Sequence, residues 1–382
     1  MIKMKVCFIA AVDSTVKVFL VDHIKAISQI FSVDIAVNTP NKSFLKPFDV
    51  DVPVVQIGIK REISIFSDAK TVIELYALFR RKRYDIVHSV TPKAGLLSMI
   101  AGYLANVPVR IHIFTGQVWV TRKGLSRWFL KALDRILVLC ATHILVDSRS
   151  QRDFLIEQGI VSNEKSTVLA DGSICGVDTD KFSPNVEARK RIRKEYGISE
   201  SDVVFLYLGR LNRDKGLLDL AHSFNEVCSK YDNTHLVIVG PDEQGVGEEV
   251  ESICASCKQK VHIAGYTDVP EQYFASADVF CLPSYREGFG VVIIQAASAG
   301  IPSIGTKIYG VVDTIEDGKT GLLYHPRDVD GLTSKMIEMI KRPDLRKTMG
   351  TNARIRASEK FSKGIVTKAL VNYYKSLLLA GN

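Results

Sequence analysis

The sequence of 382 residues has no long apolar run. No stretch reaches the roughly 18 apolar residues that a membrane-spanning helix requires, so we expect no such helix. The apolar residues 1–11 are too few for a secretory signal, and Asp13 follows them at once. We therefore expect a cytoplasmic protein, which can still touch a membrane surface.

Metal-binding patterns are also scarce. The seven cysteines are scattered, and the one C-x-x-C pattern, Cys254 with Cys257, has no second pair and no nearby histidine pair to complete a zinc site. We expect these two cysteines on a helix face. Cys7, Cys140 and Cys281 stand in apolar runs and are expected to be buried thiols. No metal and no cofactor is expected.

Two nucleotide-binding patterns are missing as well. The loop after the first apolar strand, residues 5–11, has no G-x-G-x-x-G. The glycine-containing loop after residues 203–208 lacks the G-K-[ST] ending of a P-loop. Repeats at solenoid spacing and low-complexity tracts are absent too, so dinucleotide-fingerprint, P-loop and repeat proteins are excluded.

The composition is that of a globular protein with two domains. The chain is 46% hydrophobic and 24% charged, and it is too long for a single core. A net charge of +8 and a pI near 9.0 favour acidic partners, such as nucleotide phosphates or anionic lipid. The basic residues are not interleaved with an aromatic stacking platform, so nucleic acid is not expected as a partner.

Short apolar strands alternate with helical segments, which predicts an α/β fold with parallel sheets covered on both faces. Ligand groups in such sheets come from loops at the carboxyl ends of strands. In the first half of the chain His88 ends a predicted strand, and Lys93 follows it in a loop, where it can equally be an ordinary solvated lysine. The candidate ligand-binding residues of this half are Ser14, Thr91, Lys93, Thr115 and Gly116.

Both tryptophans lie in one basic segment of the first half. Arg127, Lys131 and Arg135 recur every four residues and share one helix face, with Trp128 and Phe129 beside them. A basic stripe edged by aromatic residues fits an anionic membrane surface. The alternative is a solvated helix face whose aromatic residues belong to the core.

In the second half, a loop after the predicted strand 203–208 contains Gly209, Arg210, Lys215 and Gly216, and a helix is expected from the next residue. A glycine turn, two cations five residues apart and a helix N-terminus suit a diphosphate. Arginine can bind phosphate oxygens through two parallel hydrogen bonds, and lysine adds a point charge.

Another loop follows the buried strand predicted at residues 279–282. In it Gly288 and Gly290 follow Glu287, and an apolar segment with a helical pattern comes next. Backbone N–H groups at such a helix start can bind an anion. A carboxylate beside them is suited to accept hydrogen bonds from hydroxyls, as on a sugar. A helix-capping glutamate on a surface loop is the alternative.

The order of these motifs resembles glycosyltransferase family 4 over most of the chain. The segment 88–95 further resembles bacterial members that build lipid-linked surface polysaccharides. The motifs that carry the resemblance are Gly176-Val177-Asp178 with Phe182 and Pro184, Gly209-Arg210 with Lys215-Gly216, Gly240, Gly265, Pro283-Ser284 through Glu287-Gly288-Phe289-Gly290, Gly300 with Pro302, and Gly318 with Thr320-Gly321-Leu322-Leu323.

The resemblance implies the GT-B fold, in which two Rossmann-like domains face each other across a cleft. It implies an acceptor domain at residues 1–180, a nucleotide-sugar donor domain at 181–365, and a C-terminal helix at 366–382 that returns to the first domain. It also implies a retaining, metal-independent transfer. The candidates on the acceptor side are then the five residues of the first half given above.

The resemblance also assigns roles to residues. In the family, the residues that match Arg210 and Lys215 bind the donor diphosphate and stabilise the leaving nucleotide, and the one that matches Glu287 contacts donor-sugar hydroxyls. These three are the expected catalytic residues. The expected donor-binding residues are Gly209, Arg210, Lys215, Tyr266, Glu287, Gly288, Phe289, Gly290, Val291 and Gln295.

Two positions depart from the family pattern. The second glutamate of its Glu-x7-Glu pair, which usually binds the nucleotide ribose, is Gln295 here, so a charge-assisted hydrogen bond is lost. Many members carry His-Gly where this chain has Thr115-Gly116, which puts a histidine-assisted step in doubt. His112 is one alternation away and is expected to point elsewhere.

The leading hypothesis is transfer of a sugar from a UDP-hexose or UDP-N-acetylhexosamine to a lipid-linked saccharide in O-antigen or capsule synthesis. The protein would act at the cytoplasmic face of the cell membrane, held through the basic residues 80–83 and 119–135. A non-catalytic GT-B protein that binds a nucleotide sugar or scaffolds a complex is the first alternative. An epimerase of nucleotide sugars on the same fold is the second.

Overall fold

The computed structural model describes residues 3–60 and 64–380 and divides into two compact units. The first unit comprises Met1–Cys175 and Lys363–Asn382, and the second comprises Gly176–Ser362. The second unit therefore begins and ends a few residues from the boundaries after residues 180 and 365 that the sequence predicted.

Within its described residues, the first unit contains a parallel sheet of 7 strands in the order β3-β2-β1-β4-β5-β6-β7. Its strands are β1 Lys5–Val12, β2 Ser32–Asn38, β3 Val54–Gln56, β4 Ile86–Val90, β5 Val109–Phe114, β6 His143–Val146 and β7 Ser166–Val168. Its helices are α1 Asp13–Phe19, α2 Val21–Ser28, α3 Ile65–Lys82, α4 Pro92–Leu104, α5 Gly124–Cys140, α6 Arg149–Glu157 and α15 Lys363–Ala380.

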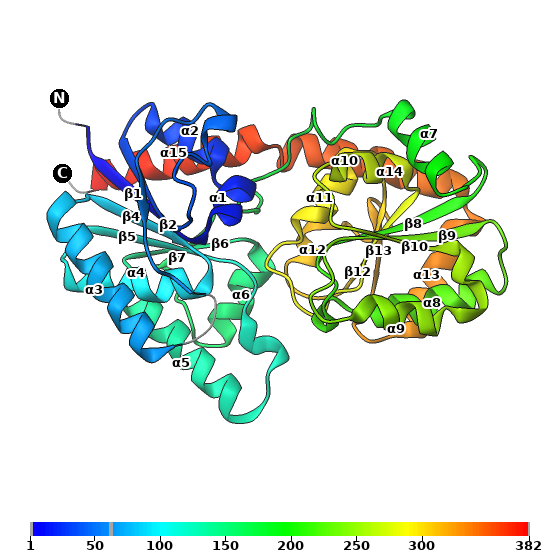
Figure 1. The fold of residues 1–382 in the computed structure, drawn as a ribbon, viewed down its shortest axis with the longest axis horizontal. Coiled ribbons are helices and arrows are strands. Elements are labelled where there is room, and N and C mark those ends of the chain that lie inside the picture. The colour runs from blue at the N-terminus through cyan, green and yellow to red at the C-terminus, as the bar shows by residue number, and fades with distance from the viewer. Residues whose placement is uncertain (1–2, 61–63, 381–382) are drawn as a thin grey trace. The chain divides into compact units, whose positions relative to one another are not determined.

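Helices cover both faces of this sheet, as the apolar strands predicted. Figure 1 shows α2 and α15 on one face, and α3, α4 and α5 together on the other. The central strands are buried on both sides: β1 keeps five consecutive residues buried, and all five residues of β4 are buried. A parallel sheet needs such apolar runs because neither face meets water. The C-terminal helix α15 belongs to this unit, where Tyr374 is fully buried.

One predicted helix differs from the structure. The sequence predicted a single helix over residues 16–31, whereas the chain forms α1 and α2 with a break at Leu20. Leu20 has a φ of −115°, outside the usual helical range. Its side chain is buried, as are those of Val16 and Ile24 on either side. The break therefore lets both short helices bury apolar residues.

The second unit repeats the architecture, with 6 parallel strands in the part of the chain that is described, in the order β10-β9-β8-β11-β12-β13. Its strands are β8 Val203–Leu208, β9 Thr234–Val239, β10 Val261–Gly265, β11 Val279–Leu282, β12 Ser303–Thr306 and β13 Gly321–Tyr324. Its helices are α7 Val186–Glu195, α8 Leu217–Cys228, α9 Val246–Ile253, α10 Pro270–Ser276, α11 Val291–Ser298, α12 Val311–Thr314, α13 Val329–Lys341 and α14 Pro343–Lys360. Figure 1 shows α10, α11 and α14 on one face of this sheet and α8, α9 and α13 on the other.

The strand order of each sheet reverses direction at one point. In the first unit this switch lies between β1 and β4, and in the second it lies between β8 and β11. Loops that leave the carboxyl ends of two such strands diverge to opposite faces of the sheet and leave a crevice, where open α/β sheets bind ligands. The topology therefore points to four loops, two in each unit.

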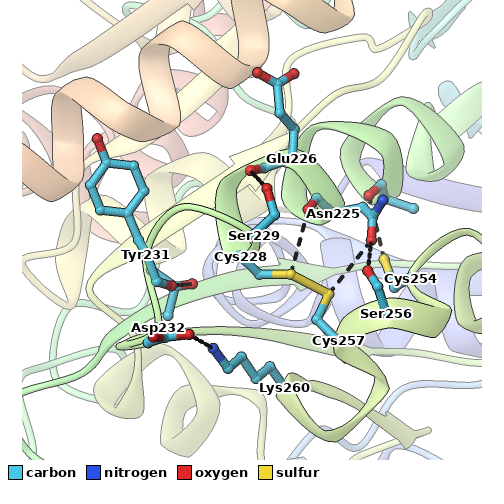
Figure 2. Close-up of a disulfide and its surroundings, with 12 residues drawn as sticks. Asn225, Glu226, Cys228, Ser229, Tyr231, Asp232, Cys254, Ser256, Cys257 and Lys260 are labelled. Carbon is cyan, nitrogen blue, oxygen red and sulfur yellow. Dashed lines mark hydrogen bonds and ion pairs between the residues drawn. A yellow bond between two sulfur atoms is a disulfide. The ribbon is translucent and has the colours of Figure 1, made fainter.

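Two expectations about cysteines were wrong. Cys257 does not lie on a free helix face but forms a disulfide with Cys228 at the end of α8, as Figure 2 shows. The thiol of Cys254 bonds instead to the carbonyl of Ala221. The sequence could not pair Cys228 with Cys257, because their separation of 29 residues carries no signal. Cys7 and Cys281 are buried free thiols, as predicted, whereas Cys140 is a free thiol that is only partly buried.

Candidate active site

The loops at the switch point of the second sheet bring the main predicted residues together. The diphosphate loop, residues 209–216, leaves β8, and the glutamate loop, residues 283–290, leaves the adjacent strand β11. The backbone N–H of Tyr285 donates to the carbonyl of Asp214 at 2.9 Å. Two loops that are separate in sequence therefore form one structure.

Gly216 makes this close approach possible. Its φ is +68°, in the left-handed region, and a Cβ atom built on it would lie 2.0 Å from the carbonyl oxygen of Pro283. Any other residue would be strained and would push the glutamate loop away. Gly216 also ends the single 3₁₀ turn Arg213–Lys215 and begins α8. The glycine in the sequence motif thus sets the spacing of the two loops.

The predicted charged residues meet across these loops. Lys215 Nζ lies 2.6 Å from Glu287 Oε1, and both side chains are mostly buried. Arg210 Nη1 lies 3.1 Å from Glu243 Oε2 at a more exposed position. Asn212 also donates to Glu243, at 3.2 Å. Arg210 and Lys215 are therefore each held by a carboxylate from a different loop.

A further hydrogen bond and an ion pair hold the glutamate loop in position. Tyr285 donates its hydroxyl to Asp219 on α8 at 2.7 Å, and Arg286 lies 3.0 Å from Asp214. Burial opposes ionisation of Asp214, but the hydrogen bond and charge of Arg286 outweigh it and lower the pKa of this carboxyl. Both loops are therefore held by groups whose charges are satisfied locally, which keeps Glu287 and Lys215 in place.

Helix α11 begins directly after the glutamate loop. Gly290 precedes it with a φ of +83°, and no side chain caps the first turn. A Cβ on Gly310 would lie 2.5 Å from the carbonyl oxygen of Gly288, so a second glycine packs against the loop. Phe289 is buried and anchors the loop in the core. The backbone N–H groups at the start of α11 are therefore a suitable place for an anionic group.

Two other predicted donor-side residues lie at the edges of this arrangement. Tyr266 follows β10, is 70% exposed, and donates its hydroxyl to Asp268 at 2.7 Å. Gln295 lies on α11, one turn beyond Val291, and is partly buried. Both remain predictions as donor-binding residues.

The candidates of the first unit lie in different surroundings. Thr91 precedes α4 with a φ of +76°, and its hydroxyl has no hydrogen-bond partner among the described residues. Lys93 is engaged by Asp68 on α3, at 2.7 Å. Ser14 lies exposed in the first turn of α1, rather than in a loop. Thr115 and Gly116 follow β5, where the carbonyl of Thr115 accepts a hydrogen bond from Gln151. Their role remains a prediction.

The two histidines discussed from the sequence are core residues of the first unit. His88 bonds through Nδ1 to the hydroxyl of Tyr374 at 2.8 Å, and His112 bonds through Nδ1 to Ser89 at 2.9 Å. Burial lowers the pKa of each to about 3, so both are neutral at physiological pH. A Cβ on Gly95 would meet the ring of His112 at 2.3 Å, which shows how closely α4 packs there.

Glu243 is the residue of this arrangement that the sequence did not single out. It follows β9, the neighbour of β8, after the Gly240-Pro241 stop. That stop marks the carboxyl end of the strand next to β8, and it was the signal in the sequence that could have singled out Glu243. Asp214 and Asp219 were missed because their role depends on contacts with a loop about 70 residues away in sequence.

The described residues contain no group of three or more His, Cys, Asp or Glu side chains that could hold a metal ion.

Of the helices in residues 3–60 and 64–380, none combines the length and the apolar character that a bilayer crossing needs.

Two family models match the chain. Residues 188–356 match the model described as glycosyl transferases group 1, and residues 31–172 match a glycosyl transferase 4-like domain. Among curated proteins, the chain is 31% identical to the capsular polysaccharide biosynthesis glycosyltransferase CapM of Staphylococcus aureus over 91% of both chains. It is 29% identical to the Escherichia coli UDP-Gal:alpha-D-GlcNAc-diphosphoundecaprenol alpha-1,3-galactosyltransferase, over 73% of this chain and 72% of that protein.

Solved structures agree in fold. Anabaena HepE in complex with UDP-glucose superposes with a TM-score of 0.80 at 19% identity, covering 98% of this chain and 100% of that one. WaaG, a glycosyltransferase involved in lipopolysaccharide biosynthesis, gives a TM-score of 0.73 at 16% identity, covering 95% and 98%. The two parallel Rossmann-like sheets are thus those of the GT-B fold, and the chain belongs to glycosyltransferase family 4.

Proposed function

We propose that the protein transfers a hexose or N-acetylhexosamine from a UDP-sugar to a lipid-linked saccharide, with retention of configuration and without a metal. The observation that carries the proposal is the pairing of Lys215 with Glu287 between the loops of β8 and β11, with Arg210 on the same loop as Lys215. A cation for the diphosphate beside a carboxylate for sugar hydroxyls is the arrangement that a nucleotide-sugar donor requires.

The proposed reaction is a front-side displacement. The bond between the anomeric carbon and the leaving phosphate oxygen breaks, and the acceptor oxygen bonds to the same face of that carbon. The proton of the acceptor hydroxyl passes to the leaving phosphate. Arg210 and Lys215 stabilise the negative charge that develops on the diphosphate, as does the N-terminus of α11.

Glu287 orients the donor sugar in this proposal. Its carboxylate accepts hydrogen bonds from sugar hydroxyls, while Lys215, which has three N–H donors, can keep its bond to Glu287 and still reach a phosphate oxygen. The ion pair therefore couples the position of the sugar to the position of the diphosphate. Such positioning keeps the anomeric carbon, on the face of its leaving phosphate, within reach of the acceptor hydroxyl.

The names of the relatives support a lipid-linked acceptor in surface polysaccharide synthesis. One is a capsular polysaccharide glycosyltransferase, and another is named for transfer from UDP-Gal to GlcNAc-diphosphoundecaprenol. An acceptor of that kind is held in a membrane, so we propose that the protein works as a peripheral protein at the cytoplasmic face of the cell membrane.

A nucleotide-release assay tests the proposal. The purified protein is given UDP-, GDP- and ADP-sugars in turn, with and without a membrane extract that supplies lipid-linked saccharides, in the presence of EDTA. Release from one UDP-sugar that depends on the extract is expected. Release only from a GDP- or ADP-sugar, or only after a divalent metal is added, would contradict it.

A non-catalytic protein that binds a nucleotide sugar is the second candidate, because Gln295 and Thr115 stand where many family members have glutamate and histidine. This candidate predicts UDP binding but no release from any donor. Restoring the family residues, by Gln295→Glu and Thr115→His together, would then be expected to create release where the natural chain has none.

A further inference from the structure

Helix α5 turns an apolar face outward. Five side chains at helical spacing form this apolar face and are exposed by 42% to 85% of their surface. They are Leu125, Trp128, Phe129, Ile136 and Leu139. The aromatic residues of this segment were expected beside a basic stripe or in the core, and Trp128, at 67% exposed, is not in the core. Adjacent exposed apolar side chains of this number mark a contact surface.

The basic stripe of Arg127, Lys131 and Arg135 lies beside this face, and its side chains make contacts within the protein. The ring of the buried Trp119 contacts two of its cations, with Arg127 Cζ 5.4 Å and Lys131 Nζ 5.0 Å from the ring centroid. Lys131 also donates to Gln158 at 3.0 Å. These contacts fix the rotation of α5, so the apolar face has to point away from the sheet.

The charges around the apolar face have one sign. Between Val109 and Val146 the sequence contains a single acidic residue, Asp134, and its carboxylate accepts a hydrogen bond from Trp119 Nε1 at 2.7 Å. The exposed cations that form the rim of the apolar face are Arg122, Lys123 and Arg135, of which Arg135 also donates to the carbonyl of Gly159 at 3.4 Å. No carboxylate in the described part of the chain lies within ion-pair distance of these three cations.

We infer that the apolar face of α5 inserts into an anionic lipid surface, with the cations of its rim among the headgroups. An apolar helix face bordered by cations matches the boundary between acyl chains and anionic headgroups. A second copy of this chain fits less well, because a symmetric contact between two α5 helices would bring like-charged rims together. The inference deepens the proposed function, since a lipid-linked acceptor lies at such a surface, but it rests on α5 alone.

Helix α3 offers a matched control in the same layer of the same unit (Figure 1). It also exposes apolar side chains, Phe66 and Ile73 among them. Its exposed apolar residues lie near the acidic Asp68 and Glu74 in sequence, whereas its basic cluster at residues 80–82 lies in the last turn. Apolar exposure alone therefore does not distinguish the helices, and the absence of exposed acid on α5 does.

Binding of the full chain to vesicles tests the inference. The vesicles are phosphatidylcholine with or without phosphatidylglycerol, at low ionic strength and with no donor or acceptor present. Co-sedimentation with the anionic vesicles is expected. The triple variant Leu125→Gln, Trp128→Gln, Leu139→Gln is expected to weaken it about tenfold or more, because the insertion of apolar surface is lost. Arg122→Gln with Lys123→Gln is expected to weaken it by about tenfold and to reduce its salt dependence.

Tryptophan emission gives a second readout, because only Trp128 of the two tryptophans is exposed. Insertion should shift the emission to shorter wavelength on addition of anionic vesicles. Trp128→Phe should abolish the shift and keep co-sedimentation, since phenylalanine remains apolar. Circular dichroism of each variant checks that the fold is kept.

Three results would overturn the inference. One is the absence of binding to anionic vesicles. Another is equal weakening by Phe66→Gln with Ile73→Gln on α3. The third is a stable dimer in sedimentation equilibrium that the triple variant of α5 breaks, because the apolar face would then be covered by a second copy. None of these results bears on release of nucleotide from a donor, so the proposed function is tested separately.

Discussion

The two sheets have the same topology but different side chains around their switch points. In the second unit the site is charged and partly exposed, with Lys215 paired to Glu287 and Arg210 paired to Glu243. In the first unit β4, next to the switch, carries His88, and the following strand β5 carries His112, and both histidines are buried and neutral. The comparison teaches that ion pairs near water can exchange partners with a charged ligand, whereas buried neutral rings serve the packing of the core.

The largest effect is expected at Glu287. Replacing it with alanine should lower turnover by ~100-fold or more, because the donor sugar loses its hydrogen-bond acceptor in the transition state. Initial rates of nucleotide release measure this. Glu249→Ala is the matched control, since Glu249 pairs with the exposed Arg213 near the same loop. Near-normal turnover of the Glu287 variant would show that the charged site of the second unit does not depend on Glu287 for transfer, and would contradict the comparison of the two units.

A buried carboxyl of the first unit gives the next largest effect. Burial raises the pKa of Asp134 from 3.8 to about 6, against the opposing hydrogen bond from Trp119. The folded state thus holds this proton more tightly than the unfolded state, so the contribution of Asp134 to stability falls as pH rises from about 4 to about 6 and stays low above it.

Asp134→Asn removes this penalty and keeps an acceptor for Trp119. At pH 7 to 8 the variant should be more stable than the natural protein by on the order of 2 kcal/mol, and the gap should close toward pH 4. Urea unfolding at several pH values measures the free energy of unfolding. A gap that is constant with pH would show that ionisation of Asp134 is not its cause.

Lys215 tests the charged site by binding rather than by turnover. Lys215→Ala should weaken UDP binding by about thirtyfold, because a charge-assisted hydrogen bond to phosphate is lost. Arg213→Ala lies in the same 3₁₀ turn and should leave UDP binding unchanged, since Arg213 points to Glu249. Isothermal titration compares the two variants, and equal losses of affinity would deny Lys215 a specific role.

The smallest effect concerns the competition for Arg210. In this structure Glu243 holds Arg210, so a diphosphate has to compete with that carboxylate. Glu243→Gln should tighten UDP binding by about threefold, the size expected for an exposed ion pair, and the gain should shrink at high salt. Weaker binding in this variant would instead make Glu243 a group that helps to hold the donor.

Much of the charged site of the second unit, and the fold that carries it, was predictable from local sequence. Arg210, Lys215 and Glu287 stand beside glycines after apolar strands, and strand ends next to a switch point are where ligands bind. The alternating apolar strands also predicted both parallel sheets. Local pattern was enough because each of these features depends on residues close together in the chain.

Other features depend on contacts between distant segments and could not be predicted. The disulfide between Cys228 and Cys257, the bond of His88 to Tyr374 and the pairing of Arg210 with Glu243 all join separate elements. The sequence left the rotation of α5 open for the same reason. Its basic stripe and its apolar face are both visible in the sequence, but the contact of Arg127 and Lys131 with Trp119 decides which one packs inward.

The central claim is that the second unit holds a diphosphate through the loops of β8 and β11. Its most direct test is titration of UDP, and separately of uridine, into the protein in the presence of EDTA. The account predicts that UDP binds at least ~100-fold more tightly than uridine, since the cations and the start of α11 act on the phosphates. Equal affinities for UDP and uridine, or UDP binding that requires a divalent metal, would contradict it.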